Sequence, residues 1–336
     1  MTASNMGAIQ EAIQEAIQAA RSILLVTHIG PDGDALGSLT AMGQALSNVN
    51  KHVVMMCDDY IANRFGFIPT IEKVVAFPDE TADFDLVIAL DCRDEFRAGN
   101  RFRMLLYTIP QSINIDHHIT NTNFADINFV DGRATSTAEM LFGLFEALSF
   151  DITSGIATSL LTGVVTDTLG FRTVGVTPYT MKVAGALMDV GGDLATITMK
   201  MLNLKPMSTI RLWQIGLNEM KLDDGVLWVA ISKEKLREIG HVGDSSHGLV
   251  NLLADVEEVA MSAVLLEMDD GSVRVGFRCR PPFSVAELAA SLGGGGHALA
   301  AGCTVEGPLD TAVSLVISKS KEAIQAQKAA LARSFD

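Results

Sequence analysis

The sequence predicts an α/β protein whose first part forms a mainly parallel sheet with helices on both faces. Short apolar runs rich in Val, Ile and Leu recur along the first third of the chain, and segments of helical character separate several of them. Near-continuous apolar strands that alternate with helices are typical of parallel sheets buried on both faces. We therefore expect helix-covered strands in this part of the chain.

The elements of this first part follow from their residue patterns. The segment from Ala8 to Ala20 repeats isoleucine every four residues, at Ile9, Ile13 and Ile17, which predicts a helix with one apolar stripe. A second helix is expected from Ala35 to Leu46. The expected strands are SILLVT (22–27), VVMMC (53–57), KVVAF (73–77), DLVIAL (85–90) and SINI (112–115).

The second half of the chain has a different pattern and predicts a smaller α/β domain. The strand-like runs VLWVAIS, VAMSAVLLEM and SVRVGFRCR are separated by the helical segments HGLVNLLADV and VAELAASL. A last helix is expected from Leu309 to Arg333. We expect a first domain over residues 1–190, a connecting helix and linker over 191–206, and a second domain over 207–336.

Composition narrows the class of function. A chain of 336 residues with 48% hydrophobic content can bury two cores, and its formal charge of −15 argues against a protein that coats long nucleic acid. Small or short anionic substrates remain compatible with that charge. The sequence contains no long apolar run, and MTASNMGAIQ does not resemble a signal peptide, so we expect a cytoplasmic protein. The four cysteines form no CxxC pair and are expected to be core residues: Cys57, Cys92, Cys279 and Cys303.

Polar side chains follow three of the expected strands. In a parallel sheet the ligand site forms beyond the carboxyl ends of the strands. The residues that follow strands 22–27, 85–90 and 112–115 are His28, Asp91 and the triplet Asp116, His117 and His118. Three strand ends therefore bring metal-competent groups to the same edge.

Two further segments add carboxylates to this set. The loop HIGPDGDALGS contains Asp32 and Asp34, and its Pro and Gly residues let neighbouring side chains converge. The helical segment ATSLLTGVVTDTLGF ends near Asp167. The complete candidate set is His28, Asp32, Asp34, Asp91, His117 and Asp167.

Six such groups are too many for one structural zinc ion, which takes four ligands and prefers sulfur and nitrogen. Two divalent cations fit the set better, and mixed carboxylate and imidazole ligands suit manganese without excluding cobalt or zinc. Paired cations of this kind hold the attacking and leaving oxygens of an in-line displacement at phosphorus.

Each acid also has a plainer interpretation. Asp32 and Asp34 could form turns and cap a helix, and Asp91 could cap the element that follows it. Asp167 could be an ordinary acid at a helix end, and single histidines are more often structural. These interpretations do not explain why HxxxDxD, a strand-end Asp, DHH and a distal Asp occur together in this order.

The ordered segments HIGPDGDALGS, ALDCRD, NIDHHITN and VVTDTLGFR resemble the four metal-binding motifs of the DHH phosphoesterase superfamily. The resemblance covers roughly residues 22–172 and implies specific roles. His28 and Asp32 would hold one metal ion. Asp34, His117 and Asp167 would hold the other, and Asp91 would bridge the two. His118 would face the scissile phosphate as an electrophile or general acid, and Asp116 would orient an imidazole.

The fourth motif departs from the family pattern. Its relatives read Asp-Thr-Gly-x-Phe-Arg, whereas DTLGFR places Gly170 one position later, so we expect ligation by Asp167 but a different local turn. Arg172 could face the substrate or form a structural ion pair.

The segment SLGGGGHALAAG, together with the upstream GFRCR, resembles the DHH-associated domain that grips nucleotide substrates. The resemblance implies that Arg278 contacts a substrate phosphate or base. It also implies that a glycine-rich loop holds the terminal phosphate through Gly294, Gly295, Gly296 and His297. Relatives often have serine after the arginine, whereas this chain has Cys279. The sequence therefore does not decide whether this position forms the hydrogen bond to the substrate. A glycine run by itself would also suit a flexible loop.

The compact two-domain form resembles the oligoribonuclease, or nanoRNase, branch of the superfamily. This resemblance implies a manganese-dependent enzyme that cuts RNAs of two to five nucleotides exonucleolytically to mononucleotides, and that converts 3′-phosphoadenosine 5′-phosphate to AMP. It also implies an active site in the interdomain cleft and a homodimer that takes neither long DNA nor a membrane as partner. The alternatives are a phosphodiesterase for cyclic or linear signalling dinucleotides and a catalytically inactive nucleotide-binding module.

Overall fold

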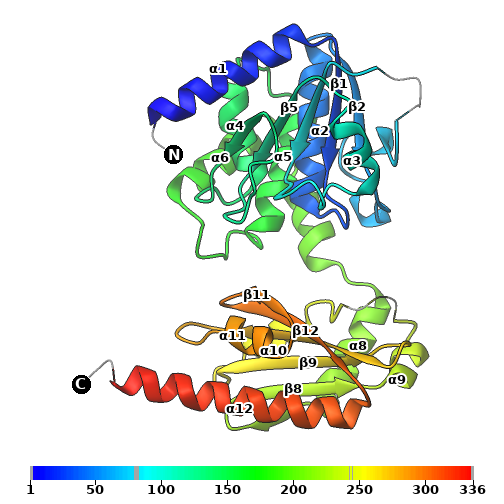
Figure 1. Cartoon of the computed structure of the whole chain (residues 1–336), viewed down its shortest axis with the longest axis vertical. Helices are drawn as coiled ribbons and strands as arrows, with labels where there is room; N and C mark the ends of the chain where they lie inside the picture. Colours follow the sequence, from blue (N-terminus) through cyan, green and yellow to red (C-terminus); the bar gives the residue numbers. More distant parts are fainter. Residues whose placement is uncertain (1–2, 79–82, 242, 244, 334–336) are drawn as a thin grey trace. The chain divides into compact units, whose positions relative to one another are not determined.

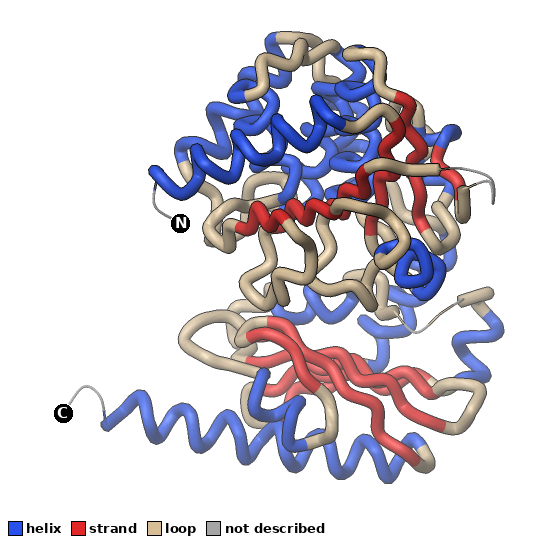
Figure 2. Tube along the Cα trace, turned by 45° about the horizontal axis from the view of Figure 1, so that its top comes forward, coloured by secondary structure: helices blue, strands red, loops and turns tan. Residues whose placement is uncertain are grey.

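The computed structural model describes residues 3–78, 83–241, 243 and 245–333, with side chains from Met6 onward. The chain divides into a first unit, Met1–Leu204, and a second unit, Lys205–Asp336 (Figure 1). Each unit contains one sheet (Figure 2). No helix in the described ranges is long and apolar enough to cross a membrane.

The first unit is built on a six-stranded sheet in the order β3-β2-β1-β4-β5-β6, and every neighbouring pair is parallel. This arrangement confirms the predicted parallel sheet. The strands are β1 (Ser22–Thr27), β2 (His52–Cys57), β3 (Val74–Val75), β4 (Leu86–Leu90), β5 (Ser112–Asp116) and β6 (Ile127–Val130).

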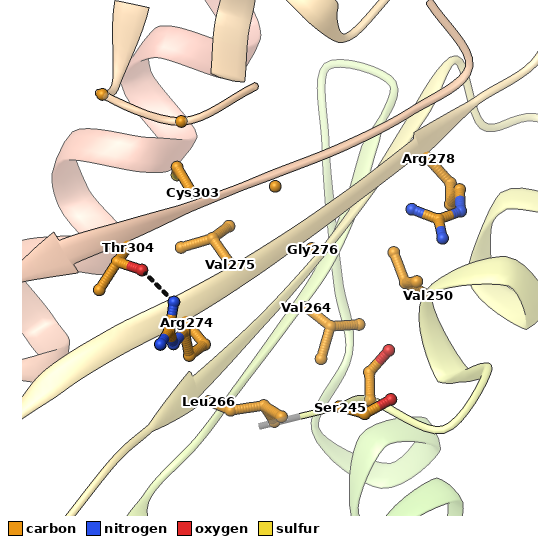
Figure 3. Close-up of a pocket in the computed structure, with 14 residues that line it drawn as sticks. Ser245, Val250, Val264, Leu266, Arg274, Val275, Gly276, Arg278, Cys303 and Thr304 are labelled. Carbon is orange, nitrogen blue, oxygen red and sulfur yellow. Dashed lines mark hydrogen bonds between the residues drawn. The ribbon is translucent and has the colours of Figure 1, made fainter. Parts of the chain in front are cut away.

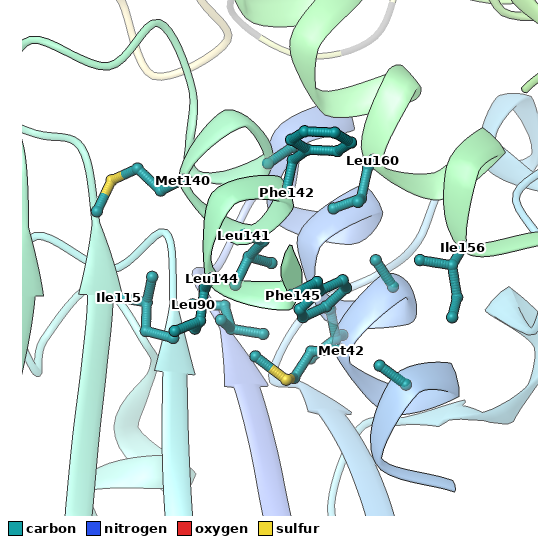
Figure 4. Packing of buried hydrophobic residues seen from close by; sticks show 14 of the residues in the cluster. Met42, Leu90, Ile115, Met140, Leu141, Phe142, Leu144, Phe145, Ile156 and Leu160 are labelled. Atoms are coloured by element: carbon teal, nitrogen blue, oxygen red, sulfur yellow. The ribbon is translucent and has the colours of Figure 1, made fainter. Parts of the chain in front are cut away.

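Helices cover both faces of this sheet because successive strand residues point to opposite sides. Ile23 and Leu25 lie in a large core with α1, α2, α4 and α5, whereas Leu24 and Val26 pack with Phe102 of α3 on the other face. Figure 4 shows part of the large core, in which Met42 of α2, Phe145 of α4 and Leu160 of α5 lie together. The helices are α1 (Ala3–Ala19), α2 (Gly33–Asn48), α3 (Asn100–Leu106), α4 (Thr137–Ala147), α5 (Ser154–Asp167), α6 (Pro178–Asp189) and α7 (Leu194–Ile197).

The first unit differs from the predicted elements in several places. The predicted strand KVVAF is reduced to β3, because Lys73 belongs to the short 3₁₀ turn η2 (Ile71–Lys73) and only Val74 and Val75 pair with β2. A similar turn, η1, covers Asn63–Phe65. The predicted connecting segment contains α7 and a π-helical turn, η3 (Thr198–Asn203). The predicted elements do not include α4 or β6, although both lie beside the strand that carries the DHH triplet.

The second unit has a mixed sheet in the order β11-β12-β10-β9-β8-β7, in which only β8 and β9 are parallel. Its last helix, α12, begins and ends as predicted and packs on one face with α11; α8, α9 and α10 pack on the other. The strands are β7 (Lys221–Asp223), β8 (Val226–Ile231), β9 (Met261–Glu267), β10 (Ser272–Cys279), β11 (Gly295–His297) and β12 (Ala300–Glu306). The helices are α8 (Met207–Glu219), α9 (Lys233–Glu238), α10 (Leu249–Ala254), α11 (Ala286–Ser291) and α12 (Leu309–Arg333).

The four cysteines are buried, as predicted, and none of them forms a disulfide in the structure. They lie in the cores of the two units, on or directly after strands, so they serve as small apolar residues there.

Candidate active site

The carboxyl edge of the first sheet carries the candidate metal-binding residues. His28 follows β1, Asp91 follows β4, and the DHH triplet begins at the last residue of β5. Asp34 lies in the first turn of α2, and Asp167 is the last residue of α5. The structure thus brings together side chains that are up to 139 positions apart in the sequence, between His28 and Asp167.

These side chains form groups whose possible ligand atoms all lie within 4.8 Å of one another. One group is His28, Asp32 and Asp91, in which His28 Nε2 lies 3.5 Å from Asp91 Oδ2 and 3.9 Å from Asp32 Oδ1. A second group is Asp34, His117 and Asp167. A third, which overlaps the second at His117, is Asp91, His117 and His118.

The distances fit ligands of a divalent cation. His117 Nε2 lies 3.2 Å from Asp167 Oδ2, 3.6 Å from Asp91 Oδ1 and 4.0 Å from the nearer oxygen of Asp34. Two ligands that each bind a metal at about 2.1 Å are separated by at most about 4.2 Å. Asp91 Oδ2 lies near the His28 imidazole, and Asp91 Oδ1 lies near the imidazoles of His117 and His118, so Asp91 offers a donor atom to two of the groups.

Hydrogen bonds hold the acids in place. Both oxygens of the fully buried Asp34 accept from the N-terminus of α4, since Thr137 N donates over 2.6 Å and Ala138 N over 2.9 Å. A helix N-terminus stabilises an anion because its first N–H groups have no partner in the helix. Gly163 of α5 faces this carboxylate, and a Cβ atom there would lie 2.4 Å from Asp34 Oδ1. Glycine therefore allows α5 to approach Asp34.

Asp32 and Asp91 show that the plainer interpretations explain only part of the pattern. Asp32 does cap α2, because its Oδ1 accepts from Asp34 N and Ala35 N, both over 3.0 Å. Asp91 caps no helix and instead adopts a left-handed backbone with φ of 60°. Such a conformation is costly for a non-glycine residue and is often retained at functional sites.

The electrostatics of the cluster show that its acids need positive charge beside them. Burial, together with the charges of Asp91 and Asp167, raises the pKa of Asp34 well above its usual range. Burial opposes the charge on His117, but its hydrogen bond to Asp167 and the surrounding carboxylates outweigh burial and raise its pKa to about 10. Burial also opposes the charge on Asp91, yet the neighbouring imidazoles lower its pKa. Divalent cations would supply the same compensation without protons.

His118 is held beside this cluster by Asp116. Its Nδ1 lies 2.7 Å from Asp116 Oδ1, and this hydrogen bond, opposed by burial, raises the pKa of His118. Asn121 donates to the other oxygen of Asp116 over 2.5 Å and to Asn114 Oδ1 over 2.8 Å. Because a carboxylate only accepts hydrogen bonds, His118 directs Nδ1–H at Asp116 and keeps Nε2 available.

The turn after α5 retains a left-handed backbone although its glycine is displaced. Leu169, Gly170 and Phe171 have φ values of 50°, 71° and 66°. At the position where the family pattern has glycine, this chain has Leu169, whose side chain makes the left-handed backbone less favourable. Arg172 is exposed and donates from Nε to the carbonyl oxygen of Leu169 over 2.8 Å, so it braces this turn.

The second unit contains a pocket of about 450 Å³ above β10 and β12 (Figure 3). Arg274 and Arg278 project from the same face of β10 on either side of Gly276, which pairs with Gly302 of β12. Bare backbone therefore forms part of its surface, and Val250, Val264 and Leu266 provide apolar walls. Arg274 donates to Thr304 Oγ1 over 2.6 Å.

The predicted substrate residues of the second unit do not all line this pocket. Arg278 and Gly294 line it, whereas Gly295, Gly296 and His297 are not among its lining residues. These three form strand β11, which pairs with β12, so the predicted glycine-rich loop is wrong as a description of this segment. The reason is packing: a Cβ atom at Gly294 or Gly296 would come within 2.6 Å of β12 backbone atoms. His297 is exposed on this strand.

Cys279 does not line the pocket either. Its side chain belongs to the core on the opposite face of β10. The thiol donates to the carbonyl oxygens of Phe283 over 3.2 Å and Ala298 over 3.4 Å. It therefore holds the backbone on both sides of the glycine-rich segment.

Sequence reasoning missed several residues that contact the predicted site residues. Thr137 contacts Asp34 and Asp91, Asn121 contacts Asp116, and Arg97 Nη2 lies 3.2 Å from His28 Nδ1. The run of small polar residues ATSTAE before an apolar helix is a helix-start signal that points to residues 135–137. No local signal points to Arg97.

The family of the chain follows from comparisons with known proteins. Residues 22–164 match the model of the DHH family, N-terminal domain, and residues 229–331 match the model of the DHHA1 domain. The chain belongs to the DHH phosphoesterase family and is a hydrolase.

Individual relatives are similar over most of the chain. The bifunctional oligoribonuclease and PAP phosphatase NrnA of Thermus thermophilus is 33% identical over 305 residues, which is 89% of either chain. The NrnA of Bacillus subtilis is 25% identical and covers 84% of this chain and 89% of its own. An exopolyphosphatase-related protein of Bacteroides fragilis shares the fold, with a TM-score of 0.87 at 24% identity, over 96% of this chain and 97% of its own.

Proposed function

We propose that this protein is a manganese-dependent phosphoesterase with two activities. It hydrolyses RNAs of two to five nucleotides exonucleolytically to mononucleotides, and it converts 3′-phosphoadenosine 5′-phosphate to AMP. The observation that carries the proposal is the clustering of the six predicted metal ligands at the carboxyl edge of the first sheet, where His118 joins them. The names of the NrnA relatives support these substrates.

We assign the metal-binding residues to two positions. His28 and Asp32 hold one cation. Asp34, His117 and Asp167 hold the other, with Asp91 shared between them. Carboxylate and imidazole donors suit Mn²⁺. When bound, the cations supply charge compensation and Lewis-acid polarisation of the phosphoryl group.

We propose that His118 donates a proton to the leaving group. Asp116 fixes the ring through Nδ1 and favours the protonated form, so Nε2–H donates toward the departing oxygen. The oxygen leaves more readily as it gains that proton. Asn121 keeps Asp116 oriented for this contact.

The pocket of the second unit supports short substrates. We propose that this pocket binds the terminal nucleotide of the substrate. Arg278 would contact a phosphate, and the apolar walls would pack against a base. A volume of about 450 Å³ suits a single nucleotide better than an extended strand. The formal charge of −15 likewise disfavours long nucleic acid. Anchoring one terminal nucleotide favours stepwise release from an end. We extend the anchoring role to His297, Gly295 and Gly296 from the family resemblance alone.

A phosphodiesterase for signalling dinucleotides is the second candidate. A cyclic-di-AMP phosphodiesterase, PdeA, of Listeria monocytogenes is 25% identical over 86% of this chain, which spans 45% of that longer protein. Its similarity supports dinucleotides as alternative substrates.

The test is a side-by-side assay of the protein with Mn²⁺. The substrates are labelled RNA dimers to pentamers, a longer RNA, 3′-phosphoadenosine 5′-phosphate, cyclic and linear dinucleotides, and bis(p-nitrophenyl) phosphate. We expect fastest turnover of the short RNAs and measurable AMP release. Preference for the longer RNA would contradict the short-substrate assignment. Hydrolysis of none of them would favour an inactive binding module.

A further inference from the structure

Thr137 is a fully buried residue whose hydroxyl group points away from its own helix. It is the first residue of α4, and the cap of that helix is the neighbouring Ser136, whose Oγ accepts from Glu139 N over 3.0 Å. Capping therefore does not require the Thr137 hydroxyl. That hydroxyl instead donates to Asp91 Oδ1 over 3.0 Å, across 46 positions of sequence.

This hydrogen bond fixes which way the Asp91 carboxylate faces. Asp91 Oδ1 lies 3.6 Å from His117 Nε2, whereas Asp91 Oδ2 lies 3.5 Å from His28 Nε2. The last torsion of an aspartate side chain is broad, so a hydroxyl donor on one oxygen, together with the neighbouring imidazoles, restricts rotation of the carboxylate away from these positions. An ionised carboxylate oxygen accepts more than one partner, and the Thr137 bond therefore leaves room for a cation on Oδ1.

The backbone of Thr137 holds a second acid. Its N–H donates to Asp34 Oδ2 over 2.6 Å, and both atoms are buried. Asp34 lies in the group with His117 and Asp167, and Asp91 lies in the group with His28 and Asp32. Thr137 thus contacts one carboxylate from each group and fixes the position of one relative to the other.

We propose that Thr137 is a positioning residue that sets Asp91 between the two cations. The inference rests on the proposed two-metal centre and adds to it the residue that aligns the shared ligand. Buried threonines commonly bond within their own helix instead. Thr162 of α5 does so, because its Oγ1 donates to the carbonyl oxygen of Thr158 over 2.8 Å. Thr162 is therefore a matched control.

The experiment measures Mn²⁺ binding to metal-free protein, without substrate. Isothermal titration gives the stoichiometry and affinity, and electron paramagnetic resonance shows whether two bound ions are spin-coupled. Thr137→Val removes the hydroxyl at nearly constant shape. We expect it to weaken the less tightly bound ion by about 10- to 100-fold and to reduce the coupled signal. Thr137→Ser keeps the hydroxyl and should restore both, and Thr162→Val should match the wild type.

Each outcome decides between the two claims. If the wild type binds two ions and Thr137→Val binds them with the same affinity and spin coupling, the proposed role of Thr137 is wrong and the proposed metal centre stands. A wild type that does not bind two ions would overturn the proposed metal centre itself. Circular dichroism checks that each variant is folded. Should Thr137→Val not fold, Thr137→Ala replaces it, and equal binding by the Ala and Ser variants would then contradict the inference.

Discussion

The candidate metal site of the first unit and the pocket of the second unit are built by opposite means. The metal centre uses buried charged side chains, of which Asp34 and Asp91 are almost fully removed from solvent. The pocket instead exposes backbone, because Gly276 and Gly302, which have no side chains, pair across β10 and β12 between two arginines.

The difference shows what each kind of site demands from the fold. Buried carboxylates must be held by partners, and those partners come from distant segments, as Thr137 and Ala138 do for Asp34. A backbone surface needs only correct strand pairing and small residues. We therefore expect substitutions at the metal centre to abolish chemistry, and substitutions in the pocket to weaken substrate binding.

The largest effect is expected from Asp91→Asn. The amide keeps the size of the side chain and tolerates the left-handed backbone at φ of 60°, but it removes the charge shared by the two groups. We expect turnover with Mn²⁺ to fall by more than about 100-fold, since even partners of metal ligands are worth about 10- to 100-fold. Steady-state assays measure this. Asp189→Asn, at the exposed last residue of α6, is the control. Substantial Mn²⁺-dependent activity in Asp91→Asn would contradict the metal assignment.

The second prediction concerns pH. A cation must bind neutral His117, whose pKa is raised to about 10 without metal, so binding releases a proton below that pH. Apparent Mn²⁺ affinity should therefore rise by up to about tenfold per pH unit as the pH rises toward about 10. The same raised pKa stabilises the metal-free fold below pH 6.5, and this stabilisation is lost as the pH rises through about 10.

Titration calorimetry in buffers of different protonation enthalpy counts the released protons, and thermal unfolding of metal-free protein follows the stability. The variant His117→Asn should show a smaller slope of affinity against pH. An affinity independent of pH in the wild type would contradict this prediction.

The third prediction tests the pocket. A Cβ atom at position 276 would meet only Val250, at 4.0 Å, so a side chain there would project into the space between Arg274 and Arg278. For Gly276→Val we expect KM for short RNA to rise by about tenfold while hydrolysis of bis(p-nitrophenyl) phosphate stays unchanged. Gly276→Ala should give an intermediate effect. Loss of both activities would show that the pocket and the metal centre do not separate in this way.

The smallest effect is expected at Leu169. Its left-handed φ of 50° is strained for leucine, and its side chain is 47% exposed, so little packing is lost on truncation. Leu169→Gly should raise the free energy of unfolding by about 1 kcal/mol, measured by denaturant unfolding. Leu169→Ala keeps the Cβ atom and the strain, so it should not gain stability. A gain in both variants would assign the effect to the exposed leucine instead.

The sequence by itself determined the parallel sheet and the edge at which polar groups gather. Continuous apolar runs define buried strands, and the ends of parallel strands meet at one edge, so His28, Asp91 and His117 could be placed together from local patterns alone. The last helix was equally readable, because its apolar residues recur at helical spacing from Leu309 onward.

Only the tertiary structure decided how those groups are held. Thr137 meets Asp91 from 46 positions away, and Asp34 meets the start of α4 from 103 positions away, so no local pattern contains either contact. The strand formed by Gly295 to His297 likewise depends on its pairing with β12, because glycine has little preference of its own for a strand. Local periodicity fixes which residues are buried, whereas the partners of buried charges depend on how distant segments pack.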